Sequence, residues 1–482
     1  MPRTEFTPGT EPGRHVAPGT DPGRWRAFVV CLMAGFMTLL DVSIVNVALP
    51  SMQAGLRISA QELSWVVAGY TLAFGLALVP SGRLGDGLGR RRVFLIGLVL
   101  FTGASLLCGL SVSGAWLVCA RLAQGAAGGA LTPQVVGLMQ QLFTGRERGV
   151  ASGFYGAMVA AATAVGPPVG GLLIQAVGWR WVFFVNVPIG VCAFVLGSRL
   201  LPPDRGKERA VRLDLPGVAL LGAGIIAVML PLIEAERRHG SPHWALLGGG
   251  AALLACFVAW ERRVRGRGGR PLVDLGLLRR RPYATGTLIG VLYFAGYTGV
   301  VFVLPLYFQR GLGYSALAAG AAGTPFSIGS AMGAALSGRA VHRLGRLLVI
   351  AGAFTVVLAL VGIAILIRHD HGTRMWLVTL VPLLVAGAGS GLVIGPNLTL
   401  ALRDVPPAEG GTAAAVLQTG QRIGSAFGLA VAGSLFLGTR TASRGDFSLS
   451  AGRALSGSAA LVGLALLVAV ADGLRRSASR EV

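Results

Sequence analysis

An aspartate stands inside the first long apolar stretch of the chain. Asp41 lies in LLDVSIVNVALP (39–50), eight residues before that stretch ends. A charge at the middle of a bilayer costs at least ~3 kcal/mol, so such a residue usually lines a cavity and binds a proton or a substrate. We expect Asp41 to be the only one of the twenty acidic residues deep within a membrane span. A satisfied structural hydrogen bond is the alternative interpretation.

Arg121 carries the opposite charge at nearly the same depth. It lies six residues after the expected start of the fourth apolar stretch. At 1.5 Å of rise per helical residue, Asp41 and Arg121 lie roughly 12 and 9 Å below the same membrane surface. Packing of the fourth helix against its neighbours is the alternative role for Arg121.

The turn GRLGDGLGRRR (82–92) places an aspartate and four arginines between two apolar stretches. Gly82 and Gly89 permit a tight reversal and close approach of another backbone. Asp86 can accept hydrogen bonds from Arg90 or Arg91 and can lie near the positive N-terminus of a neighbouring helix. This pattern predicts a conformational latch. A solvated turn that only orients the flanking helices is the alternative.

The turn recurs as GRAVHRLGR (338–346), which matches 82–90 at five of nine positions. His342 stands where the first copy has Asp86, so we do not expect the second copy to do the same electrostatic work. Each turn joins the second and third helix of a six-helix set if two helices are inserted between the sets.

The stretch GPPVGG (166–171) contains two prolines in the middle of an apolar run. Proline removes a backbone donor and bends a helix, while flanking glycines let a neighbouring helix pack against the bend. We expect Gly166, Pro167 and Gly170 to form such a packed bend. An ordinary kinked membrane helix is the alternative.

The composition indicates that these residues lie in a membrane. The chain has 482 residues, of which 53% are hydrophobic and only 13% are charged, whereas globular proteins have about 25% charged residues. Its mean hydropathy is +0.68. The sequence therefore predicts an all-α integral membrane protein, packed closely through its 73 glycines. Fourteen apolar stretches approach the length of a membrane span: 27–49, 62–81, 93–112, 115–139, 149–173, 181–201, 215–233, 244–260, 284–308, 315–338, 347–367, 375–400, 410–437 and 454–474.

Basic residues predict the orientation. With the N-terminus in the cytoplasm, 30 of the 42 Lys and Arg residues fall on the cytoplasmic side and 10 on the other. This bias places both termini in the cytoplasm. The net charge of +22 is spread over separate cytoplasmic segments, which argues against nucleic acid as a partner and favours contact with the lipid bilayer.

We predict five regions. They are a Pro/Gly-rich cytoplasmic tail without a secretory signal (1–26), a six-helix half (27–201), two additional helices with flanking loops (202–282), a second six-helix half (283–476) and a short cytoplasmic tail (477–482).

The ordered motifs resemble those of the major facilitator superfamily, and within it the fourteen-span drug:proton antiporters. The likeness covers residues 27 to 474. It rests on LLDVSIVNVALP, GRLGDGLGRRR, RLAQGAAGGA (121–130), GPPVGG and WRWVFFVNVPIG (179–190), all in register with the span count. Two departures are Ala162, where the helix-five pattern has a glycine, and His342.

The resemblance implies a major facilitator fold and export of a drug, antibiotic or similar amphipathic molecule in exchange for protons. It implies that Asp41 and Arg121 pair beside a central cavity and that the latch closes on a helix starting near 406–411. GPPVGG is associated with exporters in this family. The implied coupling ion is the proton, with no cofactor and no metal, in a monomer of the cell membrane.

Six polar or aromatic residues are candidates to line the cavity, with packing as the alternative for each: Asn46, Gln124, Tyr293, Tyr297, Asn397 and Gln418. Arg422 is left unassigned. The scarcity of buried charge favours a neutral or weakly charged substrate. Other possibilities are export of an endogenous metabolite or lipid, and less well a receptor, a channel or a membrane-embedded enzyme. The histidines lie in tails or loops, and no buried acid pair and no CxxC metal site is expected.

Overall fold

The computed structural model describes residues 22–204, 214–238, 244–269, 271–369, 374–406, 409–443 and 445–478. Most of the two predicted tails therefore lies outside the described residues. Within these ranges the chain is helical and contains no β-strand, which confirms the all-α class. The elements are α1 (Pro22–Leu56), α2 (Ala60–Leu88), α3 (Arg90–Gly109), α4 (Gly114–Leu142), α5 (Gly145–Val177), α6 (Trp181–Phe184), α7 (Asn186–Leu200), α8 (Leu215–Arg238), α9 (Trp244–Gly266), α10 (Gly276–Arg279), α11 (Arg281–Leu306), η1 (Tyr307–Gly311), α12 (Ala316–Leu344), α13 (Arg346–His369), α14 (Met375–Ala401), α15 (Gly410–Ala442) and α16 (Phe447–Ala478).

Each predicted apolar stretch coincides with a helix, with local differences. The stretch 181–201 is divided into α6 and α7 at Val185, and the stretch 284–308 continues from α11 into the π-helical turn η1. The short α10 has no predicted counterpart.

Fewer of the described helices than predicted qualify as membrane spans by length and composition. In the described part of the chain, eleven helical segments are long and apolar enough to cross a membrane by length and composition. The other long helices are α4 and α12, which mix their apolar residues with glycine, alanine and polar side chains, and α8, whose apolar part is short. The count of fourteen spans therefore stays a prediction.

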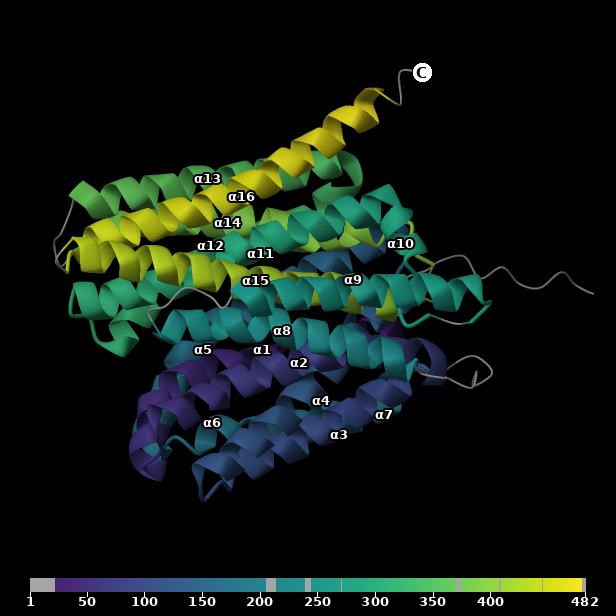
Figure 1. Cartoon of the computed structure of the whole chain (residues 1–482), viewed down its shortest axis with the longest axis horizontal. Coiled ribbons are helices and arrows are strands. Elements are labelled where there is room, and N and C mark those ends of the chain that lie inside the picture. The colour runs from purple at the N-terminus through teal and green to yellow at the C-terminus, as the bar shows by residue number, and fades with distance from the viewer. Residues whose placement is uncertain are drawn as a thin grey trace, which may run out of the picture.

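The helices lie side by side in one bundle. In Figure 1 the purple and blue helices α1–α7 lie on one side, the green and yellow helices α11–α16 lie on the other, and α8 and α9 cross the view between them. Across the middle, α2 packs on α15 and α5 packs on α12, while α8 contacts both α2 and α15. The pairs α2–α15 and α5–α12 therefore line the seam between the two groups.

Glycines allow the closest helix contacts. A Cβ on Gly428 of α15 would stand 1.8 Å from the carbonyl oxygen of Ala295 in α11, and a Cβ on Gly387 of α14 would stand 1.8 Å from the carbonyl oxygen of Phe326 in α12. Even a methyl group at these positions requires the backbones to separate. Because apolar surface gives helices no drive to associate in lipid, such close contact is the main source of packing energy.

The close approach at Gly428 can be tested on one helix. We expect Gly428→Ala to lower the thermal unfolding temperature of the purified protein markedly, because overpacking costs roughly 1–3 kcal/mol or more. Gly438→Ala is the matched control, since a Cβ there meets nothing within 4 Å and alanine favours the helix. Equal unfolding temperatures for the two variants would contradict the importance of this contact.

Candidate functional site

Asp41 is the centre of a buried polar cluster in which both carboxylate oxygens are occupied. Its Oδ2 accepts a hydrogen bond from Arg121 Nη1 at 2.7 Å, in an ion pair. Its Oδ1 accepts from Gln124 Nε2 at 2.9 Å and from Asn186 Nδ2 at 2.8 Å. The carboxylate is fully buried and Arg121 is 2% exposed. The charge is thus balanced by one guanidinium and two amides.

A second layer of contacts holds these partners in place. Arg121 Nη1 also donates to Gln124 Oε1 at 2.7 Å, and Arg121 Nε donates to the carbonyl of Val66 in α2 at 3.1 Å. Asn186 Nδ2 donates to Ser105 Oγ at 3.0 Å. The cluster therefore links α1, α2, α3, α4 and α7.

Every side chain bonded to the Asp41 carboxylate is a hydrogen-bond donor. An ionised carboxylate can accept all three hydrogen bonds, from Arg121, Gln124 and Asn186. A proton on Asp41 would remove the negative charge and occupy one acceptor oxygen, leaving Arg121 a buried cation without its counterion. Such an unpaired charge is strongly destabilising.

A cavity of about 410 Å³ lies beside the cluster. Its wall combines apolar and aromatic side chains from α1, α2, α4, α5, α8, α11, α14 and α15, including Tyr70, Phe74, Tyr155 and Phe294. Tyr70 connects the two features, because its ring lines the cavity while its centroid is 4.1 Å from the guanidinium carbon of Arg121. Met229 of α8 also lines the cavity, so the additional helices contribute to its wall.

Three of the six predicted cavity residues line this cavity, namely Asn46, Tyr297 and Gln418. The other three lie elsewhere. Gln124 belongs to the Asp41 cluster, and Tyr293 is buried behind Tyr297, with ring centroids 6.3 Å apart.

Asn397 is also buried away from the cavity, where it donates to the carbonyl of Gly286 and accepts from Arg346. Arg422, which the sequence left unassigned, does line the cavity. Hydropathy cannot distinguish these cases because the helices are apolar on all sides.

The predicted latch residue Asp86 is bonded to both sides of the helix bundle. Its Oδ1 accepts from Arg90 Nη2 at 2.7 Å and Nε at 3.1 Å, both within the turn. Across the seam, Asp86 Oδ1 accepts from the backbone N–H of Gly411 at 3.1 Å, and Oδ2 accepts from the backbone N–H and the hydroxyl of Thr412, both at 2.7 Å. The carboxylate therefore caps the positive N-terminus of α15.

The neighbouring residues have distinct roles. A Cβ on Gly82 would stand 2.8 Å from the carbonyl oxygen of Gly411, so α2 and α15 nearly touch at this point. Gly89 has φ +105°, a conformation that favours glycine. Arg91 does not bond Asp86; its Nη2 donates to the carbonyl of Ser198 and its backbone N–H donates to Asp204. Arg90 alone is thus the partner of Asp86 within the turn.

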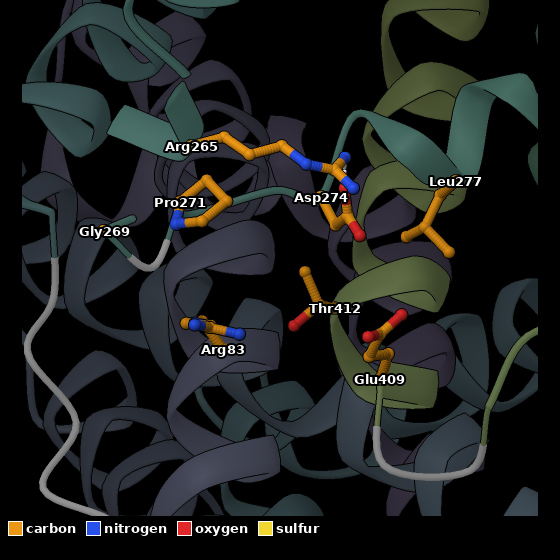
Figure 2. Close-up of a pocket in the computed structure, with 8 residues that line it drawn as sticks. All are labelled: Arg83, Arg265, Gly269, Pro271, Asp274, Leu277, Glu409 and Thr412. Atoms are coloured by element: carbon orange, nitrogen blue, oxygen red, sulfur yellow. Dashed lines mark hydrogen bonds and ion pairs between the residues drawn. The ribbon is translucent and has the colours of Figure 1, made fainter. Parts of the chain in front are cut away.

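A second pocket, of about 260 Å³, adjoins the latch. Figure 2 shows Arg83 and Thr412 on one side of it and the ion pair of Arg265 and Asp274 on the other. The loop after α9 thus lies next to the α2–α15 contact.

The second copy of the turn is built differently. His342 is exposed, and its imidazole lies beside Gly149 near the start of α5. Arg346, the counterpart of Arg90, pairs with buried Asp472 at the end of the bundle, with Nε 2.9 Å from Oδ2. A histidine cannot reproduce the carboxylate cap of Asp86, because an imidazole lacks the second acceptor.

The prolines of GPPVGG leave α5 continuous, and one freed carbonyl finds a partner. Pro167 has no N–H for the carbonyl of Thr163, four residues earlier. Ser43 Oγ of α1 donates to that carbonyl at 3.2 Å. A Cβ on Gly166 would stand 2.3 Å from Ser43 Oγ, and a Cβ on Gly170 would stand 3.2 Å from Ile44. The motif therefore packs α5 closely against α1.

Two further acidic side chains are buried, each near the end of its helix, and the position of Asp41 as the only acid deep within a span stays a prediction. Asp472 is 2% exposed and Glu261 is 1% exposed. Glu261 also lies near Asp214, since oxygens of both carboxylates stand within 2.8 Å of the place of a Cβ on Gly217. Asp214 is only half-buried, so the two carboxylates do not form a fully buried pair. The loop after α9 folds over Glu261, whose Oε2 accepts from the N–H of Val273.

No group of three metal-ligating side chains occurs among the residues that the structure describes. Glu62 caps the start of α2 by accepting from the N–H and the hydroxyl of Ser59. It therefore has a structural role.

Comparisons with known proteins agree with this architecture. The chain is 41% identical over 424 residues to a probable actinorhodin transporter of Streptomyces coelicolor, covering 86% of this chain and 73% of that protein. It is 38% identical over 460 residues to the puromycin resistance protein pur8 of Streptomyces alboniger, covering 93% and 90%. It is 32% identical over 415 residues to the tetracenomycin C resistance and export protein of Streptomyces glaucescens, covering 85% and 76%.

A solved structure shares the fold at low sequence similarity. The human organic anion transporter MFSD10 superposes with a TM-score of 0.65 at 16% identity, covering 93% of this chain and all of that one. The family model of the Major Facilitator Superfamily matches residues 31–429. The chain therefore belongs to the major facilitator superfamily of membrane transporters.

Proposed function

We propose that the chain is a proton-coupled antiporter that exports an antibiotic, drug or similar amphipathic small molecule by alternating access. Substrate binds in the cavity beside Asp41, and the two groups of helices rock about it. The observation that carries the proposal is the buried Asp41–Arg121 pair, which lies one side chain away from a cavity of drug-like size. Relatives named for antibiotic resistance and export support the direction of transport.

Alternating access also requires a contact that forms when one face of the transporter is closed and breaks when that face opens. The latch at Asp86 supplies such a contact. Asp86 joins α2 to the N-terminus of α15. Separation of these helices removes three hydrogen bonds to the carboxylate while Arg90 stays attached. The α2–α15 face therefore has a closed state that charge stabilises and an open state that loses this stabilisation.

The wider arrangement is part of the same proposal. Fourteen spans form six-helix halves at 27–201 and 283–476, joined by the two additional helices at 202–282, with both termini in the cytoplasm. The protein acts as a monomer in the cell membrane, uses protons as its coupling ion and needs no cofactor. An exporter of an endogenous metabolite or lipid is the second candidate, because a cavity with apolar and aromatic walls also suits such molecules.

The proton site is tested by Asp41→Asn. Asparagine keeps the shape of the protonated carboxyl but cannot cycle between two charges, so we expect proton-coupled efflux to be abolished while some downhill movement of substrate remains. The measurement is substrate transport into everted vesicles energised only by an imposed pH gradient, together with substrate-induced proton release.

The control for this test is the double variant Asp41→Asn, Arg121→Gln. It separates loss of the proton site from the damage caused by an unpaired buried arginine. If the Asp41→Asn protein still concentrates substrate with the pH gradient as its only energy source, Asp41 is not the proton site.

The latch is tested by Asp86→Asn. The change preserves shape but removes the charge from a carboxylate that caps a helix and pairs with Arg90, and charged hydrogen bonds are worth roughly 1.5–3 kcal/mol each. We expect the protein to fold and insert, with a transport rate at least tenfold lower at matched membrane levels. His342→Ala, at the same position of the second turn, should stay within about twofold of the parent. Comparable losses in the two variants would disprove the asymmetry of the turns.

A further inference from the structure

The cavity contains one side chain whose charge the described structure does not balance. Arg422 of α15 lines the cavity, and no hydrogen bond or ion pair joins it to any residue within the described ranges. Its guanidinium carbon lies 4.5 Å from the centroid of the Phe74 ring of α2. An arginine keeps its proton under all physiological conditions, so the cavity wall is permanently cationic.

The other residues of the cavity wall do not neutralise the charge of Arg422. Among the described residues that line the cavity there is no aspartate and no glutamate. Asp41 lies outside the lining, and its oxygens are occupied by Arg121, Gln124 and Asn186. The face of Phe74 offers a cation–π contact, which is weaker than a charged hydrogen bond and leaves all five N–H donors of the guanidinium unused.

The surroundings of Arg422 complete a binding site for one anionic group on an apolar body. Gln418, one helical turn earlier, also lines the cavity, and its side-chain amide carries N–H donors that an anion can accept from. Aromatic rings of Tyr70, Tyr155 and Phe294 provide flat apolar walls in the same cavity. A planar guanidinium binds a carboxylate or similar anion through two parallel hydrogen bonds.

We propose that Arg422 binds an acidic group of the substrate, so that the cavity takes amphipathic organic anions with an aromatic or otherwise apolar body. The inference rests on the proposed function, since it names the substrate class of the same cavity. It also narrows the expectation of a neutral or weakly charged substrate to a substrate that carries one negative charge. Because Arg422 belongs to α15 and Phe74 to α2, the anion binds at the seam that must open and close during transport.

Equilibrium binding to the purified full-length protein tests this substrate class. The probes are anthracene-2-carboxylate, the neutral anthracene-2-carboxamide and the cationic 2-(aminomethyl)anthracene, whose own fluorescence reports binding. We expect the carboxylate to bind at least tenfold more tightly than the other two, as follows from charged hydrogen bonds in a buried site. Arg422→Gln should raise the Kd of the carboxylate at least tenfold and change that of the carboxamide by no more than about twofold.

Two further variants keep the test specific. Arg440→Gln is the matched control, because Arg440 is also on α15 and also contacts an aromatic ring, 4.4 Å from Phe447, but lies outside the cavity. It should bind all probes like the parent. Arg422→Lys keeps the charge without the planar fork and should retain part of the preference, even if Arg422→Gln fails to fold.

The proposal is overturned if the parent protein does not prefer the carboxylate, including the case in which no probe binds. It is also overturned if Arg422→Gln weakens the carboxylate and the carboxamide equally. These measurements use no proton gradient. A protein that lacks proton coupling can therefore still show the anion preference, and a coupled exporter can still lack it, so the two proposals fail separately.

Discussion

A charge buried among helices in lipid is costly unless another charge or a full set of hydrogen bonds balances it, and this constraint organises the molecule around three of its carboxylates. Asp41 is matched by Arg121, Asp472 by Arg346, and Asp86 by Arg90 together with the N-terminus of α15. Each match joins different helices or helix ends. Because moving one partner exposes the other as an unpaired charge, these contacts fix helix positions more sharply than apolar packing does.

The charge pairs differ in whether they lie within one group of helices or cross between the two groups. The Asp41 cluster joins α1, α2, α3, α4 and α7, which lie on one side of the bundle, so it can persist while the two groups of helices move. The bonds of Asp86 to Gly411 and Thr412 cross the seam and would break if the two groups separated. In the proposed transport cycle, protonation of Asp41 and opening at Asp86 are therefore separate events. They are connected through α2, which carries Asp86 and receives the bond from Arg121 at Val66.

The sequence predicts those features that a charge in an apolar stretch reveals. The pairing of Asp41 with Arg121, the capping of α15 by Asp86 and the all-helical fold follow from charge, spacing and family motifs. It does not predict which face of a helix a residue occupies when all faces are apolar, so Asn397 and Gln124 were assigned to the cavity and Arg422 was not. Asn186 donates to Asp41, but it lies inside the motif WRWVFFVNVPIG, and nothing in that motif indicates a contact with Asp41. The burial of Glu261 depends on a loop that local sequence does not specify.

An anionic substrate limits how proton coupling can operate. Protonation of Asp41 makes its surroundings more positive, and by electrostatics alone this would strengthen the binding of an anion near Arg422. Exchange of a proton for an anion therefore requires that the two ligands favour different conformations, since a ligand shifts an equilibrium only by its difference in affinity between states. The membrane potential would assist the proposed export step, because an anion leaving a negative interior gains about 2.3 kcal/mol per 100 mV. Arg422 of α15 and Phe74 of α2 face each other across the seam, so binding of an anion there, as we propose, would depend on whether the seam is closed.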